Sequence, residues 1–136
     1  NYLDVDNDAL YPFGYGLSYT TFRFSDITLN RSSIGMDNEL VASVTVTNTG
    51  DRAGSEVVQL YIRDLVGSVT RPVKELKGFE KIYLQPNESR TVRFTIAPEM
   101  LKFYNADLKF VTEPGDFDVM IGPDSRNVKT ARFTLR

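Results

Sequence analysis

The chain has 136 residues, enough for one domain with its own core, and 41% of them are hydrophobic. Its 16 basic and 18 acidic residues give a net charge of -2 without a long block of either sign, which argues against a nucleic-acid partner. No apolar run approaches the ~20 residues of a membrane helix, so we expect no membrane partner either. The sequence has no Cys and no His, so it lacks thiolate sites and the commonest general base and metal ligand. These exclusions favour a non-catalytic domain that needs no cofactor.

The N-terminal residues carry three evenly spaced carboxylates and do not begin at a natural start, so we expect a fragment or a processed product. Asp4, Asp6 and Asp8 have the spacing that opens an EF-hand calcium loop. The motif then fails, because Ala9 and Tyr15 stand where the loop requires Gly and Glu. We therefore expect a solvated acidic segment and no metal site.

Residues 1–21 are predicted to form a connector that is rich in aromatic rings. Its candidate docking residues are Tyr11, Phe13, Gly14, Tyr15, Gly16 and Tyr19. Such rings can stack on saccharides if they are exposed, or pack between two domains if they are covered. We favour domain packing, because the two glycines allow a close backbone approach and Trp, the strongest stacking residue, is absent.

From Phe22 onward, apolar residues recur mostly at period 2, in short runs separated by Gly, Pro, Asn and Asp, which is typical of β-strands. The predicted strands are 22–29 with a bulge near Ser25 and Asp26, then 40–48, 56–64, 76–84, 90–96, 116–122 and 129–135. An eighth strand can include 101–104 or 110–111, and the only candidate helical turn is 98–102. About seven to eight short strands without a convincing helix predict an all-β, two-sheet sandwich over residues 22–136.

The strand periodicity also predicts which side chains face the core. In the clearest run, Leu40, Ala42, Val44 and Val46 share one face, and the intervening Ser and Thr residues share the other. The same alternation predicts further inward residues: Val58, Leu60, Ile62, Val92, Phe94, Ile96, Phe117, Val119, Ile121, Ala131, Phe133 and Leu135. By this reasoning Asp116 and Asp118, on either side of Phe117, face water and are not a catalytic carboxyl pair.

The polar stretch 64–74 is long for a connection in a sandwich, and long loops are often functional. Within or beside it lie three cations, Arg63, Arg71 and Lys74. The segment is either a loop that leans on a neighbouring domain or a solvated loop, and the sequence favours neither.

Four segments together resemble the C-terminal region of glycoside hydrolase family 3 enzymes such as β-glucosidases. They are YPFGYGLSYTTF at 11–22, VTVTNTGDRAGSEVVQLYIRD at 44–64, RPVKELKGFEKI at 71–82 and EPGDFDVMIG at 113–122. The resemblance covers nearly the whole chain in one order, and it implies a fibronectin type III-like (immunoglobulin-like) sandwich. In that family the catalytic carboxylates lie in the two preceding domains, and no stretch of this sequence matches their motifs.

The resemblance thus implies an accessory domain that docks on the catalytic domains of the same polypeptide, a periplasmic or secreted β-glucosidase or β-xylosidase. A carbohydrate-binding module that holds polysaccharide and an independent protein-interaction module are the alternatives.

Overall fold

The computed structural model describes residues 20–65 and 73–136, which form an almost entirely β structure. The strands are β1 (Phe22–Phe24), β2 (Thr28–Leu29), β3 (Ser33–Ile34), β4 (Leu40–Asn48), β5 (Gly54–Asp64), β6 (Lys74–Leu84), β7 (Ser89–Ile96), β8 (Phe103–Tyr104), β9 (Phe110–Val111), β10 (Gly115–Gly122) and β11 (Lys129–Leu135). One short 3-10 helix, Pro98–Leu101, coincides with the predicted helical turn.

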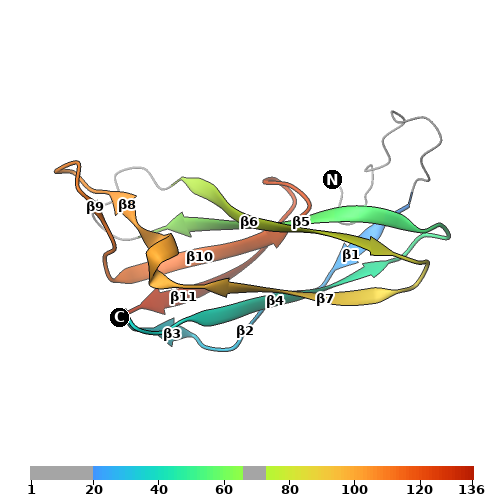
Figure 1. The fold of residues 1–136 in the computed structure, drawn as a ribbon, viewed down its shortest axis with the longest axis horizontal. Coiled ribbons are helices and arrows are strands. Elements are labelled where there is room, and N and C mark those ends of the chain that lie inside the picture. The colour runs from blue at the N-terminus through green and yellow to red at the C-terminus, as the bar shows by residue number, and fades with distance from the viewer. Residues whose placement is uncertain (1–19, 66–72) are drawn as a thin grey trace.

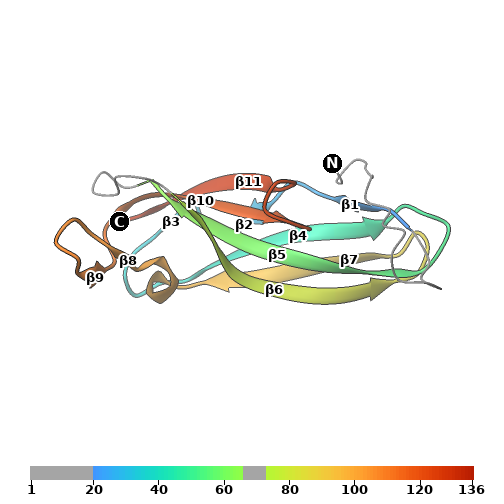
Figure 2. The ribbon, with the colours of Figure 1, turned by 90° about the horizontal axis from the view of Figure 1, so that it is seen from above.

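Two sheets pack face to face in an elongated sandwich (Figures 1 and 2). In the first, β4 lies at the centre and pairs antiparallel with β1, β2 and β7. The second has the order β3-β11-β10-β5-β6, antiparallel except for the β3-β11 pair. The small β8-β9 hairpin projects from one end of the sandwich. The predicted all-β sandwich is confirmed, and both candidates for an extra strand are present because they pair with each other.

The predicted bulge near Ser25 and Asp26 is an interruption between two short strands, since β1 and β2 both pair with β4. Ser25 fills the gap: its amide donates to the carbonyl oxygen of Thr45 at 2.9 Å, and its hydroxyl oxygen accepts from the Thr45 amide at 2.8 Å. The change of parity that the sequence indicated is therefore real, and a side chain bridges it.

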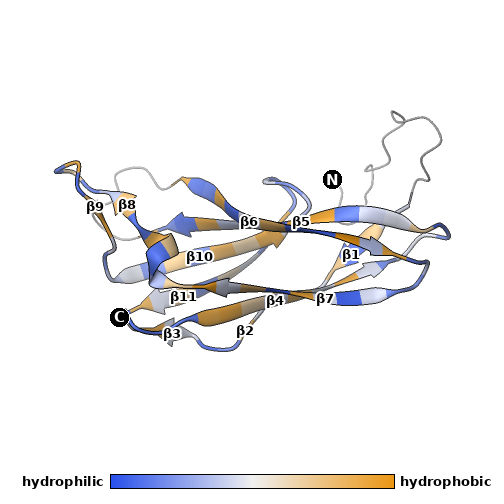
Figure 3. Ribbon diagram, viewed as in Figure 1, coloured by the Kyte–Doolittle hydropathy of each residue, from blue (hydrophilic) through white to orange (hydrophobic). Residues whose placement is uncertain are grey.

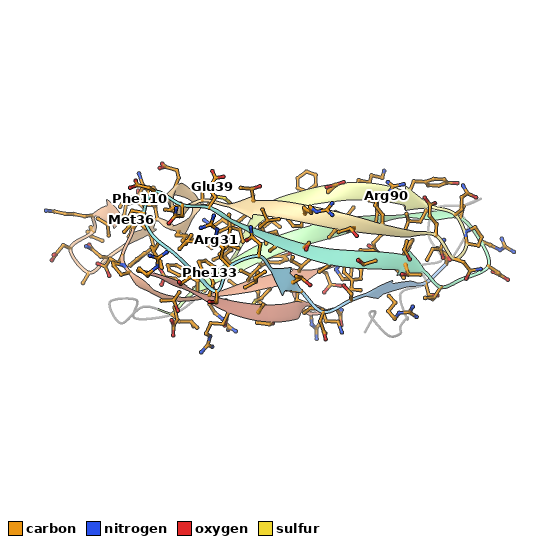
Figure 4. The ribbon with its side chains drawn as sticks, turned by 90° about the horizontal axis from the view of Figure 1, so that it is seen from below. Arg31, Met36, Glu39, Arg90, Phe110 and Phe133 are labelled. Carbon is orange, nitrogen blue, oxygen red and sulfur yellow. The ribbon has the colours of Figure 1, made fainter. Side chains whose placement is uncertain are left out.

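The core lies between the sheets and includes most of the residues that the periodicity selected, together with Phe24, Ile34, Ile82, Leu84 and Leu101. Leu40, Ala42, Val44 and Val46 are all buried, as are the inward residues of β5 and β10. Phe117 and Phe133 stack across the β10-β11 pair with ring centroids 5.4 Å apart, and Figure 4 labels Phe133. Phe94 and Ala131, which were also predicted to face inward, are only partly buried. Figure 3 shows the alternation of apolar and polar residues along the strands.

Candidate functional site

The chain enters the sandwich at the end of β6. Thr20 is the first described residue, and its hydroxyl donates a 2.6 Å hydrogen bond to Oδ1 of Asn48. A Cβ added to Gly54 would lie 2.6 Å from Cγ2 of Thr20, so the close approach of Thr20 to the start of β5 requires glycine. Gly54 pairs with Leu84, which places the entry of the chain beside the end of β6. The predicted docking residues Tyr11, Phe13, Gly14, Tyr15, Gly16 and Tyr19 lie outside the described residues.

Asn48, at the end of β4, is fully buried and holds this entry point together. Its side-chain amide donates to the carbonyl oxygens of Arg52 at 2.8 Å and Leu84 at 3.0 Å. Its Oδ1 accepts from Thr20 and from the amide of Gly50. One side chain therefore links the first sheet, the turn after β4 and the last residue of β6. The sequence alone marks Asn48 only as the end of a strand, because its buried position depends on contacts between distant residues.

Arg63 and Asp118 form an ion pair on the outer face of the five-stranded sheet. Asp118 is 5% exposed, and its carboxylate lies 3.6 Å from Nη2 of Arg63 and 3.1 Å from Nε of Arg132. The prediction that Asp118 faces water was wrong, because β10 is flanked by β5 and β11, whose long arginine side chains cover it. Asp116 is exposed as predicted and accepts a 2.8 Å hydrogen bond from Thr134.

The structure places two of the three cations of the predicted interdomain loop in strands. Arg63 lies near the end of β5, and Lys74 is the first residue of β6. The Lys74 ammonium donates to the carbonyl oxygen of Ser125, in the connection between β10 and β11. Arg71 lies outside the described residues. Arg63 and Lys74 thus both have partners inside the domain, and an interdomain contact for the three cations stays a prediction.

The outer face of β6 carries a row of exposed apolar side chains. Leu76 is 52%, Phe79 68% and Tyr83 55% exposed. They share this face because a bulge opposite Leu60 and Tyr61 shifts the register of β6 between Leu76 and Gly78. β6 is the edge strand of the five-stranded sheet in the described part of the chain, so the row borders an open sheet edge. We call Leu76, Phe79 and Tyr83 the β6 stripe.

A pocket of about 260 Å³ lies at the end of the sandwich opposite the chain entry, between the five-stranded sheet and residues 100–104. Its apolar lining includes Ile62, Leu101 and Phe117. Its charged lining includes Glu75, Lys77 and Lys102, and Phe103 and Tyr104 of β8 complete this side of it.

The β8-β9 hairpin beside this pocket presents exposed aromatic rings. Tyr104 is 66% and Phe110 55% exposed, and their ring centroids are 4.9 Å apart. The ammonium of Lys102 lies 5.8 Å from the centroid of Phe110. Figure 4 labels Phe110 at this end of the molecule and Arg90 toward the other end. Exposed aromatic rings, charged groups and a pocket are therefore gathered at one end of the sandwich.

Two carboxyl groups near the β10-β11 connection have shifted pKa values. Burial raises the pKa of Glu56 to about 7, opposed by the hydrogen bond from the Val57 amide and reinforced by the nearby Asp124. Partial burial acts to raise the pKa of Asp124 as well, but hydrogen bonds from Asn127 and the Arg126 amide leave it below its usual value.

Among residues 20–65 and 73–136, no group of three or more His, Cys, Asp and Glu side chains could hold a metal ion. No helix in the same residues is long and apolar enough to cross a membrane.

Comparison with known proteins decides the family. A model of the fibronectin type III-like domain matches residues 56–125, which include most of β5 and all of β6 to β10. The chain belongs to the fibronectin type III-like domain family. The two-sheet sandwich, the β6 stripe and the buried Asn48 are thus features of a fibronectin type III-like domain.

The relatives of this fibronectin type III-like domain are much longer proteins. It is 54% identical over 134 residues to a periplasmic β-glucosidase of Salmonella typhimurium, covering 98% of this chain and 18% of that protein. A putative β-xylosidase of Formosa agariphila is 52% identical, with 99% of this chain and 18% of the relative covered. A solved β-glucosidase from Erythrobacter marinus superposes with a TM-score of 0.80 at 49% identity, covering 100% of this chain and 18% of that one. The resemblance to the fibronectin type III-like domain of glycoside hydrolase family 3 enzymes is thereby confirmed.

Proposed function

We propose that this domain is a non-catalytic, C-terminal accessory part of a longer glycoside hydrolase of the β-glucosidase or β-xylosidase type. Its role is to stabilise the catalytic domains of the same polypeptide by docking against them. The parent protein is periplasmic or secreted, in line with the name of the Salmonella relative. Residues 1–21 are the connector from the catalytic domains, and residues 22–136 are the sandwich.

The observation that carries this proposal is the exposed β6 stripe. It lies on a chain that spans only 18% of the length of the Salmonella and Formosa relatives. Three large apolar side chains on one strand face are costly to leave in water, and such patches commonly mark a contact surface. The stripe ends at Tyr83, next to Leu84, beside which the chain enters from its N-terminal side. A preceding domain would therefore lie close to the stripe.

The partner that fits this surface is the rest of the parent polypeptide. In the relatives, about four-fifths of the length lies outside the part that corresponds to this chain. A domain on the same chain is present at a high effective concentration, so a modest apolar surface is sufficient for docking. Covering the β6 stripe would also protect an edge strand of 11 residues from pairing with other chains.

The test compares Phe79→Ala and Tyr83→Ala in the parent enzyme and in this chain alone. In the parent, we expect each variant to lower the melting temperature by several degrees, because an interface contact of about 1–3 kcal/mol is lost. In the isolated chain the same rings face water, so we expect changes within about 0.5 kcal/mol. The matched control is Tyr104→Ala, which removes another exposed tyrosine, at the far end of the sandwich. Unchanged melting of the parent for both β6 variants would refute docking through this stripe.

A second candidate, an independent interaction module, predicts that the reading frame upstream encodes no hydrolase. The coding sequence that precedes residue 1 decides between the two.

A further inference from the structure

The pocket at the end of the sandwich opposite the chain entry combines an apolar floor with a charged rim. Ile62, Leu101 and Phe117 belong to the core, so the floor is fixed by packing. At the rim, Lys77 and Glu75 form an ion pair of 3.1 Å on β6, and Lys102 pairs with Glu99 at 3.3 Å beside the 3-10 helix. The pocket therefore presents both hydrogen-bond donors and acceptors above an apolar surface.

We propose that this pocket binds one ring of a saccharide, with its apolar face against the apolar floor and the exposed Tyr104 at its edge, and its hydroxyls on the charged rim. The volume of about 260 Å³ is just below the ~300–1,000 Å³ of pockets for drug-sized ligands, which suits one ring better than a long oligosaccharide. This proposal does not depend on the docking role, because the pocket and the β6 stripe are different surfaces.

A saccharide fits this lining better than an apolar side chain of a protein partner. An apolar group that filled the pocket would strip water from Glu75, Lys77 and Lys102 without replacing their hydrogen bonds. A sugar ring carries hydroxyls, which donate to carboxylates and accept from ammonium groups, and C–H faces, which pack on aromatic rings. The mixed lining therefore selects a ligand that is polar at its edges and apolar on its faces.

Side-chain hydrogen bonds define the turn of the β8-β9 hairpin beside the pocket. Oδ1 of Asn105 accepts hydrogen bonds from the amides of Asp107 at 2.9 Å and Lys109 at 3.0 Å. Leu108 completes the turn with a φ of 61°, a conformation that a leucine rarely adopts. A hydrogen-bonded turn lowers the entropic cost of ordering Tyr104, which lines the pocket, on binding.

The first experiment titrates the ¹⁵N-labelled chain with glucose, xylose, cellobiose and xylobiose and follows amide chemical shifts. We expect saturable shifts at the pocket residues with a dissociation constant of about 1–10 mM, as is typical of a ligand with about a dozen heavy atoms. Sorbitol, an open-chain polyol without a ring face, is the control ligand. No saturation up to about 50 mM for any sugar, or equal shifts with sorbitol, would overturn the proposal.

The second experiment uses matched tyrosine variants whose folding is checked by circular dichroism. Tyr104→Ala should weaken sugar binding by at least about tenfold, whereas Tyr83→Ala on the β6 stripe should leave it unchanged. Lys77→Met, which keeps the alkyl stem and removes the donor, should also weaken binding, and it serves alone if Tyr104→Ala does not fold. Equal affinity in all variants contradicts the proposal. A second outcome also contradicts the proposal. If the pocket amides are protected from hydrogen exchange in the parent enzyme, and added sugar does not change this protection, the pocket is a protein interface.

Discussion

The side-chain amide of Asn48 donates a 3.0 Å hydrogen bond to the carbonyl oxygen of Leu84, joining the end of the central strand of one sheet to the end of the edge strand of the other. The same side chain receives hydrogen bonds from Thr20 and Gly50, so the chain entry, a turn and both sheets depend on one buried residue. Asn48 therefore connects the entering chain to Leu84, the residue next to the end of the β6 stripe.

We expect Asn48→Leu to destabilise the domain by about 2–4 kcal/mol, because the buried carbonyl oxygen of Leu84 loses a donor and the amide of Gly50 loses an acceptor. Urea denaturation of both proteins measures the loss. The control is Asn30→Ala. The side chain of this exposed asparagine accepts a hydrogen bond from the Val41 amide, and its loss should cost no more than about 1 kcal/mol. Equal losses would mean that Asn48 is not the link between the sheets.

A charge in the core should unfold the domain. Val44 is 2% exposed at the centre of β4, so Val44→Asp buries a carboxylate without a partner, which costs several kcal/mol out of the roughly 5–15 kcal/mol that hold a domain together. Circular dichroism should show loss of the β-sheet spectrum and of the cooperative melting transition. The control is Thr45→Asp, at the next residue, whose side chain is on the outer face of the sheet. This variant should melt at nearly the same temperature as the unsubstituted chain. A normal transition for Val44→Asp would contradict the strand facing.

The carboxylate of Asp118 stabilises two arginine side chains on the outer face of the five-stranded sheet. We expect Asp118→Asn to destabilise the domain by about 2 kcal/mol, because Arg63 and Arg132 lose their shared partner on a surface that water reaches only in part. Asp116→Asn, at an exposed position on the same strand face, should change stability by less than about 0.5 kcal/mol. Thermal melting at low and high salt measures the stability change of each variant. Equal changes for Asp118→Asn and Asp116→Asn would show that the burial of Asp118 does not strengthen its ion pairs.

The stability of the domain should fall as the pH rises from about 4.5 to about 7, because of Glu56. Its pKa in the folded state, about 7, lies above the unfolded value of 4.5, so the folded protein binds more protons in this window. Glu56→Gln removes this proton uptake and should stabilise the domain by about 1–3 kcal/mol at pH 8, with partial solvent screening included. At pH 4 the two proteins should have nearly equal stability.

Urea midpoints at pH 4, 6 and 8 test this prediction. Glu80→Gln is the control, since Glu80 is exposed on β6. Asp124 acts with the opposite sign: its lowered pKa contributes stability above its unfolded value of 3.8 that is lost as the pH falls through its folded pKa. A Glu56→Gln variant that is destabilised equally at all three pH values would show that the carboxyl group is needed for packing.

The strands and the core could be predicted because each depends on local periodicity. In β4 the alternation of Leu40, Ala42, Val44 and Val46 with polar residues is enough to define a half-buried strand. In β6 the same rule fails, since a bulge brings Leu76 and Phe79 to one face although they are three residues apart. A bulge depends on the partner strand, which a single sequence does not reveal.

The candidate sites depend on contacts between distant residues, and the sequence could not predict them. Asp118 alternates with core residues as an exposed carboxylate would, yet Arg63 and Arg132 on neighbouring strands cover it. The pocket brings Ile62, Lys77 and Lys102 together from three separate elements, and no spacing in the sequence connects them. The residue type does not distinguish an exposed phenylalanine, such as Phe79, from one that is buried in the core.

The connector prediction concerns Phe13 and Tyr15, which lie outside the described residues. If the connector rings pack between the sandwich and a preceding domain, their loss should harm the parent enzyme and spare the isolated chain. Removing a ring from a well-packed site costs ~3–5 kcal/mol, so Phe13→Ala and Tyr15→Ala should lower the melting temperature or yield of the parent. KM should be largely unchanged, because no substrate contact is lost. In the isolated chain both substitutions should be nearly neutral.

Melting temperatures of both variants in both proteins decide between three positions for the rings. Equal losses in chain and parent would place the rings against the core of the sandwich itself, and a selective rise in KM would indicate sugar contact. The Tyr83→Ala variant extends the comparison, because the chain enters beside Leu84 and the stripe ends at Tyr83. If the connector and the stripe face the same preceding domain, Tyr15→Ala and Tyr83→Ala should lower the stability of the parent by less together than the sum of their separate effects. Strictly additive losses would mean that the two surfaces contact different parts of the parent.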